Sequence, residues 1–339
     1  MSKIREQTWR FDRPVYIEST GTTTGPLEGR GPLGGTFDTC YAVLNCGEKD
    51  WVNAERTLLR RAVNFCLAKA GKQTSDIDLF LAGDLMDQTV TANFIARELR
   101  IPYFGMFGAC STSMETLAQA AQLVESGYAD HALCAVSSHN ATAERQFRYP
   151  TEYGGPHNLT QTFTVTGAAA ALIGREKGKV RVCEATIGRV IDWGIGDPNN
   201  LGAAMAPAAA DTIWRHFQDT GRTPDAYDLI VTGDLSSVGS PLLVELLSEK
   251  GLAIHRQHKD CGLMIYSPDQ PVNAGGSGTA CSAVVTFGYL YQKLAEGTMH
   301  RVLVVATGAL MNQATTKQKD TIPCIAHGIV LESAREDEP

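Results

Sequence analysis

The chain contains an internal repeat that constrains its fold more than any other feature. The stretch GKQTSDIDLFLAGDL, which begins at Gly71, matches GRTPDAYDLIVTGDL, which begins at Gly221, without a gap. A second pair follows in the same order: ESGYADHALCAVSS from Glu125 and AEGTMHRVLVVATG from Ala295. A third and weaker match relates TGAAAALIG in the first half to HGIVL near the other end. Repetition over such a long period predicts a duplicated domain rather than a solenoid, with chance reuse of α/β patterns as the alternative.

The repeated stretches alternate between strand-like and helix-like patterns. We predict strands at 78–82, 103–106, 133–137 and 168–173, and equivalent strands at 229–232, 262–265, 302–307 and 328–331. We predict helices at 51–70, 88–99, 113–126, 204–218, 241–250 and 281–295. Short apolar runs between helices indicate α/β sheets buried on both faces. The polar stretch REKGK separates two expected units, residues 1–176 and 177–339, related by a pseudo-twofold axis.

Composition excludes several classes of protein. The 339 residues are 43% hydrophobic and 20% charged, which suits a chain with a large core. The longest uncharged apolar stretches are far shorter than the roughly 20 residues that span a bilayer, and the first residues lack the apolar segment of a signal peptide. The net charge of −7, with no basic run, disfavours nucleic-acid binding. We therefore expect no signal peptide, no transmembrane segment and no nucleic-acid partner.

Nine cysteines are present, and their spacing does not indicate a metal site. No pair has CxxC spacing, and none has the histidine neighbours typical of zinc ligands. An odd number of cysteines without a secretory signal indicates a reducing compartment. We expect eight of them to be packing or loop residues, and we expect neither a metal ion nor a cofactor.

Cys110 is the exception because of its local sequence. The strand predicted at 103–106 is followed by the tight connection FGACST and then by a helix. The small residues Gly108 and Ala109 allow a sharp turn, which places Cys110 at a helix N-terminus, where a thiolate is favoured. A strand, a small residue, a nucleophile and a helix have the layout of a nucleophile elbow. The alternative is an inert cysteine that happens to precede a helix.

The two halves together resemble the thiolase superfamily, which includes thiolases and β-ketoacyl synthases. The resemblance rests on GAC at the helix start in the first half, NAGGSG at the equivalent point in the second, and TGAAAALIG. It implies a five-layer αβαβα sandwich and places the superfamily's nucleophilic cysteine at Cys110, where the chain reads ACSTSMETL. It also implies a homodimer that pairs through a first-half strand near the nucleophile.

Longer stretches resemble a family of sporulation proteins from spore-forming bacteria. These stretches are GTTTGPLEGRGPLGGTFD, GDLMDQ, FGACSTSMETLAQA, SSHNATAERQFRYPTEYG and QPVNAGGSGTACSA. The resemblance implies non-catalytic binding of dipicolinic acid (pyridine-2,6-dicarboxylate), either as the free acid or as its calcium chelate. It implies a role in uptake into the developing spore and in release at germination. The implied partners are other stage V sporulation A membrane proteins, and the implied location is peripheral to the spore inner membrane.

The second half lacks the histidines that the enzymes of the superfamily use. A synthase-type histidine would follow the strand at 229–232, where the chain reads GDLS with Asp234, and a thiolase-type GHP would follow NAGG, where it reads SGTACSA. Asn273 fits the position before a glycine pair better than a catalytic position. Without a general base, condensation on Cys110 is disfavoured. Two alternatives stay open: an acyltransferase or ketoacyl synthase that loads Cys110 from coenzyme A, and a scaffold without a ligand.

A pocket for a small dianion is the remaining prediction. Helix N-termini near Cys110 and Gly278 should converge, and their backbone N–H groups can bind an anion. Hydroxyl groups of Ser111, Thr112, Ser277 and Thr279 should add donors. The predicted ligand-binding residues are Cys110, Ser111, Thr112, His139, Asn140, Arg148, Gly275, Gly276 and Ser277, with no residue assigned a catalytic or metal-binding role.

The segment 138–161 contributes several of these candidates. It is polar and follows a strand, and a loop of this length is usually functional. Arg145 and Arg148 could pair with carboxylates, and the aromatic residues Phe147, Tyr149 and Tyr153 could stack on a pyridine ring. The plain alternatives are that His139 and Asn140 only form a turn, and that Asp84 and Asp234 only end strands or cap helices.

Overall fold

A computed structural model describes residues 2–147 and 157–334. Its centre is a mixed sheet whose strands lie in the order β12-β11-β14-β15-β10-β3-β9-β7-β5-β6. The first-half strands are β3 (Tyr16–Thr24), β5 (Leu79–Gly83), β6 (Tyr103–Gly105), β7 (His131–Ser138) and β9 (Gly167–Gly174). The second-half strands are β10 (Val180–Thr186), β11 (Leu229–Thr232), β12 (His258–Asp260), β14 (Arg301–Ala309) and β15 (Cys324–Ser333).

The two halves of this sheet have the same topology. Outward from the β3–β10 junction, each half has two antiparallel pairings followed by two parallel pairings. The predicted boundary at residue 176 lies in the connection between β9 and β10.

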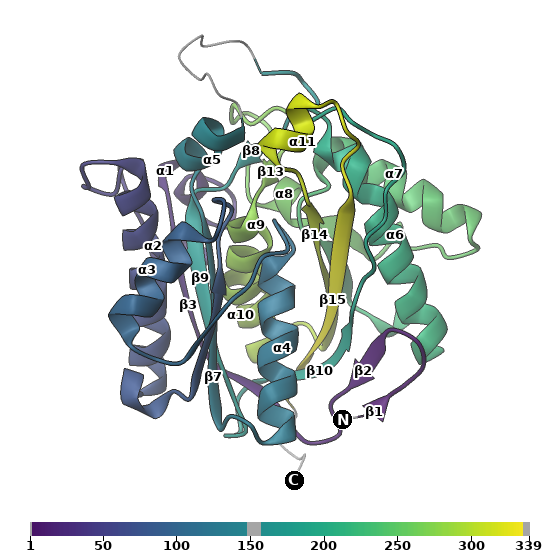
Figure 1. The fold of residues 1–339 in the computed structure, drawn as a ribbon. Coiled ribbons are helices and arrows are strands. Elements are labelled where there is room, and N and C mark those ends of the chain that lie inside the picture. The colour runs from purple at the N-terminus through teal and green to yellow at the C-terminus, as the bar shows by residue number, and fades with distance from the viewer. Residues whose placement is uncertain (1, 148–156, 335–339) are drawn as a thin grey trace.

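The helices form three layers around the two halves of the sheet (Figure 1). One outer layer holds α2 (Trp51–Ala70) and α3 (Val90–Leu99), and the other holds α6 (Leu201–Thr220) and α7 (Ser236–Glu249). The middle layer holds α4 (Thr112–Ser126), α9 (Thr279–Val284), the π-helical segment η5 (Val285–Leu290) and α10 (Tyr291–Ala295). The result is the predicted five-layer αβαβα sandwich, with hydrophobic clusters between the layers.

Short elements complete the described chain. They are β1 (Ser2–Lys3), β2 (Thr8–Arg10), α1 (Pro26–Gly29), η1 (Gly34–Thr36), β4 (Thr39–Cys40), η2 (Thr74–Asp76), α5 (Asn140–Phe147), β8 (Phe163–Thr164), η4 (Pro224–Ala226), α8 (Cys261–Met264), β13 (Gly276–Ser277) and α11 (Gln313–Lys317). None of the described helices is long and apolar enough to cross a membrane. All nine cysteines are free thiols.

Residues at equivalent positions of the repeat make equivalent contacts in both halves. Helices α2 and α6 end at Gly71 and Gly221, whose φ angles of 64° and 68° lie in the left-handed region that favours glycine. Asp78 Oδ2 accepts hydrogen bonds from two backbone N–H groups at the start of β7, at 2.8 and 3.0 Å. Asp228 Oδ2 does the same at the start of β14, at 2.6 and 2.9 Å. The repeat therefore marks the residues that join each strand to its neighbour.

Several sequence-based predictions of elements were wrong. The predicted strand at 262–265 is helix α8, and the strand in this region is β12, which precedes it. Helix α7 begins at Ser236 instead of 241, because the Asp260 carboxylate accepts the N–H groups of Leu235 and Ser236 at 2.9 and 3.0 Å. The segment 138–161, predicted as a loop, contains helix α5. The strands β3 and β10 were not predicted.

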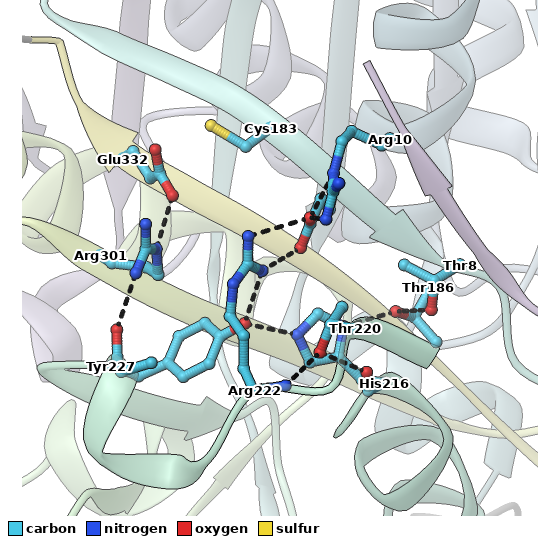
Figure 2. Close-up of polar contacts among 12 residues, drawn as sticks. Thr8, Arg10, Cys183, Thr186, His216, Thr220, Arg222, Tyr227, Arg301 and Glu332 are labelled. Atoms are coloured by element: carbon cyan, nitrogen blue, oxygen red, sulfur yellow. Dashed lines mark hydrogen bonds and ion pairs between the residues drawn. The ribbon is translucent and has the colours of Figure 1, made fainter. Parts of the chain in front are cut away.

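The N-terminal hairpin β1–β2 is attached to the second half by a buried polar network (Figure 2). Glu184 on β10 is 1% exposed and accepts hydrogen bonds from both Arg10 and Arg222. Burial opposes its ionisation, but these two guanidinium groups lower the pKa of Glu184 below its ordinary value. The His216 ring lies between the hydroxyls of Thr186 and Tyr227, at 2.8 and 2.6 Å. The hairpin is therefore held by charge as well as by its pairing with β10.

Candidate functional site

Cys110 lies in a strained connection between β6 and α4. The preceding Ala109 has a φ of +51°, in the left-handed region that non-glycine residues rarely adopt. Side-chain bonds hold the turn: Ser111 Oγ donates to the Gly108 carbonyl at 2.6 Å, and Thr112 Oγ1 donates to the Ala109 carbonyl at 2.7 Å. The strand–turn–helix layout expected around Cys110 is therefore present.

A cavity of about 110 Å³ opens beside Cys110. Its lining comes from the Cys110 turn, α5, the segments 161–164 and 198–201, β13 and the chain after β14. Polar groups that line it include Glu144, Gln161, Asn199 and Ser277. Among the described lining residues there is no histidine, lysine or arginine, and Glu144 is the single carboxylate. Glu144 itself lies 3.9 Å from the His157 ring.

The buried Asp234 lies near Cys110 and adds to the effect of burial on the pKa of the Cys110 thiol. The Asp234 carboxyl is 1% exposed, accepts the Thr307 hydroxyl at 2.6 Å and the Gly278 N–H at 3.1 Å, and is hydrogen-bonded to the Cys110 thiol. Burial raises the pKa of Asp234 to about 7, although these hydrogen bonds oppose the shift. Burial and the neighbouring Asp234 raise the pKa of Cys110 well above its ordinary value.

This electrostatic arrangement corrects the expectation of a thiolate at position 110. The N-terminal end of α4 favours a negative charge on Cys110, but desolvation and Asp234 both disfavour it. The net effect is a raised pKa, so Cys110 is a neutral thiol at neutral pH. The sequence shows only the helix start, whereas Asp234 arrives from the other half of the chain.

Of the predicted ligand-binding residues, Cys110 and Ser277 line the cavity. Ser111 and Thr112 are fully buried, and their hydroxyls bond to the turn itself. The Gly275 carbonyl accepts the N–H of Phe163 at 2.8 Å. Gly276 lies in β13, which pairs with β8. Because their backbones build the wall that carries Ser277, these two glycines support the cavity without lining it.

His139 and Asn140 lie away from the cavity. The His139 ring is buried: its Nδ1 accepts the Ala141 N–H at 3.1 Å, so Nε2 donates to the Leu44 carbonyl at 2.9 Å. Burial lowers the pKa of His139, which keeps the ring neutral. The Asn140 N–H donates to Thr166 Oγ1 at 3.0 Å. Both residues anchor the start of α5.

The other candidates of the segment 138–161 have different positions. Phe147 lines the cavity, whereas Arg145 is exposed on α5 and is not among the lining residues. Arg148, Tyr149 and Tyr153 fall outside the described residues.

The starts of α4 and α9 are packed against each other, as expected. The hydroxyls of Ser113 and Ser282 are 2.7 Å apart. Thr279 Oγ1 donates to the Ser137 carbonyl at 2.7 Å, so this hydroxyl does not point to a ligand. The Gly278 N–H already bonds to Asp234. Sequence reasoning identified this junction but missed Gln161 and Asn199 on its wall, and it interpreted Asp234 as a structural residue.

No group of three or more histidine, cysteine or acidic side chains within residues 2–147 and 157–334 is arranged to hold a metal ion.

Solved structures with the same fold define the class. The chain matches 3-oxoacyl-[acyl-carrier-protein] synthase III from Aquifex aeolicus with a TM-score of 0.53 and 15% identity, covering 96% of this chain and 98% of that one. It matches the corresponding synthase from Pseudomonas aeruginosa with a TM-score of 0.55 and 14% identity, over 95% and 99%. OleA from Xanthomonas campestris matches with a TM-score of 0.56 and 15% identity, over 96% and 98%. The protein is thus thiolase-like in fold.

Within this class, sequence comparison identifies the family. The family described as stage V sporulation protein AD matches residues 5–332. Stage V sporulation protein AD of Bacillus subtilis (strain 168) is 56% identical over 334 residues, which covers 98% of this chain and 99% of that protein. The chain belongs to the stage V sporulation protein AD family of sporulation proteins.

Proposed function

We propose that the cavity beside Cys110 binds dipicolinic acid without changing it chemically. The observation that carries the proposal is the cavity beside Cys110, whose described lining holds no histidine that could act as a general base, while burial and the nearby Asp234 raise the pKa of the Cys110 thiol. The raised pKa leaves a superfamily cysteine at the cavity wall as a neutral thiol. The choice of ligand rests on the sequence resemblance to sporulation proteins that bind dipicolinic acid.

The lining of the cavity suits a small planar ligand with polar edges. Phe107 and Phe147 offer apolar surface for an aromatic ring. Amide and hydroxyl groups of Gln161, Asn199 and Ser277 offer hydrogen-bond donors. The volume of about 110 Å³ is well below the roughly 300 Å³ at which sites for drug-sized ligands begin.

The charge of the cavity favours entry of the ligand as its calcium chelate. The described lining carries the Glu144 carboxylate and no cationic side chain. A bare dicarboxylate would be repelled by Glu144, whereas a chelated calcium ion cancels the ligand's charge. Hard oxygen ligands such as Glu144 also suit calcium.

Calorimetry with the purified full chain tests this function. Dipicolinate is titrated alone and with equimolar calcium into the parent protein, Cys110→Ala and the control Cys40→Ala, whose thiol is exposed away from the cavity. We expect saturable heat for the parent and the control, stronger with calcium, and weaker binding for Cys110→Ala. Absence of heat from the parent at millimolar ligand, with and without calcium, would contradict the proposal.

An acyltransferase that uses Cys110 as its nucleophile is the second candidate. The observation in its favour is the strained φ of Ala109 next to Cys110, because strained backbone residues cluster at active sites. Intact-mass measurement after incubation with acetyl-coenzyme A distinguishes the two functions. Binding without catalysis predicts no adduct, whereas a stoichiometric adduct that disappears in Cys110→Ala would establish the transferase.

The proposed assembly is a homodimer that pairs through the edge strand β6. Phe104 on β6 and the nearby Phe107 are 53% and 43% exposed, although they are large apolar side chains. An apolar edge strand is a surface for pairing with another chain. Analytical ultracentrifugation should show a dimer for the parent and a monomer for Phe104→Lys. A monomeric parent at micromolar concentration would refute this assembly.

The proposed location is peripheral to the spore inner membrane, where other stage V sporulation A membrane proteins would hold the protein during uptake and germination. Fractionation of forespores tests it. The protein should sediment with inner membranes and be released by high salt or urea without detergent, whereas recovery only in the soluble fraction would contradict it.

A further inference from the structure

Helix α5 carries part of the cavity wall and is anchored near each of its ends. The residues that it contributes to the lining are Ala143, Glu144 and Phe147. Near its start, Thr142 and Ala143 are buried. Near its other end, Gln146 Nε2 donates to the Leu85 carbonyl at 3.1 Å. The contacts of Thr142 therefore bear directly on the position of this wall.

The Glu55 carboxyl on α2 contacts Thr142 in the interior of the protein. Glu55 is 1% exposed. Its Oε1 accepts the hydroxyl of Ser137, at the end of β7, at 2.9 Å, and its Oε2 lies 2.8 Å from Thr142 Oγ1. One buried carboxyl thus links α5 to both α2 and β7.

The hydrogen bonds around Thr142 indicate where the carboxyl proton of Glu55 lies. Thr142 Oγ1 is also 2.9 Å from the His139 carbonyl, which accepts hydrogen bonds only. A hydroxyl has one hydrogen to donate. Both contacts are hydrogen bonds when Thr142 donates to the carbonyl and accepts from a protonated Glu55 Oε2. An ionised Glu55 would compete with the carbonyl for that single hydrogen.

The electrostatic surroundings of Glu55 favour the protonated form as well. Burial and the nearby Asp84 carboxyl, which follows β5, raise the pKa of Glu55 to about 8, although hydroxyl hydrogen bonds oppose the shift. Burial raises the pKa of Asp84 to about 6, so Asp84 loses its proton first. Other ionisable groups of α2, α3, α5 and the end of β7 have different environments: Arg56 and Arg97 lie over the Phe94 ring, Arg60 pairs with Glu98, Glu144 lines the cavity, Arg145 is exposed, and burial keeps His139 neutral.

We propose that Glu55 is a positioning residue that fastens α5 through a retained proton, and that loss of this proton loosens α5 and with it the cavity wall. An ionised Glu55 buried beside the Asp84 carboxylate requires water to stabilise its charge. Water can reach Oε2 when Thr142 moves away with α5. The inference goes beyond the proposed function, because it assigns a pH dependence to the wall itself, with or without a ligand.

Hydrogen–deuterium exchange of the full chain tests this role without a ligand. The protection factor of the α5 peptide is measured at pH 6, 7 and 8, because this ratio removes the intrinsic effect of pH on exchange. Glu55→Gln keeps the shape of the side chain, can donate to Thr142 through Nε2 and cannot ionise. Thr142→Val keeps the shape of Thr142 and removes its hydroxyl. Glu98→Gln is the matched control, because it removes an exposed carboxylate of the neighbouring α3.

The direction of the effect follows from the raised pKa of Glu55. The closed form of α5 binds more protons than an opened form in which Glu55 is hydrated, so protection falls as the pH rises from 6 towards 8. We expect a loss of about tenfold between pH 6 and pH 7 in the parent and in Glu98→Gln. Glu55→Gln should keep the parent's protection at pH 6 and show no such loss. Thr142→Val should lose about fivefold already at pH 6.

Two results in the exchange experiment would overturn the inference. Parent protection that is independent of pH, or an equal loss in Glu55→Gln, refutes the role of the Glu55 proton. Parent-like protection of Thr142→Val at pH 6 refutes the contact through which Glu55 would act.

Calorimetry with dipicolinate at pH 6 and pH 8 adds a measurement that rests on the proposed function. Relative to Glu55→Gln, the parent should bind more weakly at pH 8 than at pH 6. An equal ratio of affinities at both pH values would refute the link between α5 and the cavity. If neither protein binds at either pH, the proposed function fails, while the exchange experiment still decides the role of Glu55.

Discussion

Replacing Asp234 with asparagine tests the electrostatics of the site directly. The substitution keeps the shape of the side chain and removes its charge. An asparagine in this place can accept the Gly278 N–H through Oδ1 and donate through Nδ2 to the Thr307 hydroxyl, so two of the three contacts of the carboxyl are preserved, the third being with the Cys110 thiol. The variant therefore isolates the cost of ionising a fully buried group.

The size of the effect follows from the pKa of Asp234. Burial raises it from 3.8 to about 7. A raised carboxyl pKa means that the folded state binds more protons than the unfolded state between these two values, so stability falls as the pH rises through this window. Each pH unit contributes about 1.4 kcal/mol. Because the group is half protonated at pH 7, the parent should lose about 2 kcal/mol between pH 5 and pH 7 that Asp234→Asn does not lose.

Urea unfolding at pH 5, 6, 7 and 8 measures this difference. We expect the stability gained by Asp234→Asn over the parent to grow by about 3 kcal/mol across the series and to level off above pH 7. Asp228→Asn is the control. Burial tends to raise the pKa of Asp228, but hydrogen bonds from backbone N–H groups lower it below its ordinary value. The Asp228 carboxylate should therefore stabilise the fold equally at pH 5 and pH 8. If the gain of Asp234→Asn does not change with pH, the assigned burial energetics are wrong.

Three further predictions follow from the same contacts. Alkylation of Cys110 by iodoacetamide at pH 8 should be at least tenfold slower than that of the exposed Cys40, and Asp234→Asn should accelerate it; equal rates in the parent would show a thiolate at position 110. Calorimetric affinity for free dipicolinate should fall by up to tenfold per unit above pH 7, because a dianion binds best beside a protonated Asp234, and a flat profile would disprove the coupling. Glu184→Gln should lower the urea-unfolding free energy by about 3 kcal/mol because two arginines lose a buried partner, whereas the exposed Glu98→Gln should cost less than about 1 kcal/mol; similar losses would mean that Glu184 is not a buried ion-pair partner.

The layered α/β fold could be predicted because its signals are local. Glycine ends of helices, apolar strands and the repeated aspartates all lie within a few residues of the elements they define. Cys110 was identified for the same reason, since strand, small residues, cysteine and helix follow one another directly. Local patterns of this kind can be interpreted without knowing which other elements pack against them.

The central strand β3 could not be predicted because its sequence does not look apolar. Strand β3 reads YIESTGTTT and is nevertheless buried along most of its length. Its hydroxyls are satisfied by helix α2: Ser19 Oγ donates to the Cys66 carbonyl at 2.8 Å, and Thr23 Oγ1 donates to the Leu58 carbonyl at 2.9 Å. Burial of polar residues through long-range hydrogen bonds leaves no periodic trace in the sequence.

The residues that line the cavity were harder to predict than the strands, because they come from segments that are far apart in the sequence. His139 follows a strand end that points to the correct edge of the sheet, yet its ring turns inward to the Leu44 carbonyl. Gln161 lies in a stretch whose sequence has no distinctive pattern, and it lines the same cavity as Ser277 because β8, which follows it, pairs with β13. Sequence position indicates the edge on which a residue lies, but not the direction of its side chain.

The divergence of Asp84 and Asp234, which occupy the same position of the repeat, has a physical cause. In the first half Asp84 caps the adjacent helix α3. Its carboxylate accepts the N–H groups of Met86 and Ala92 at 3.0 and 2.8 Å. In the second half Asp260 performs the capping of α7. This frees the Asp234 carboxyl to face the junction and bond to Cys110.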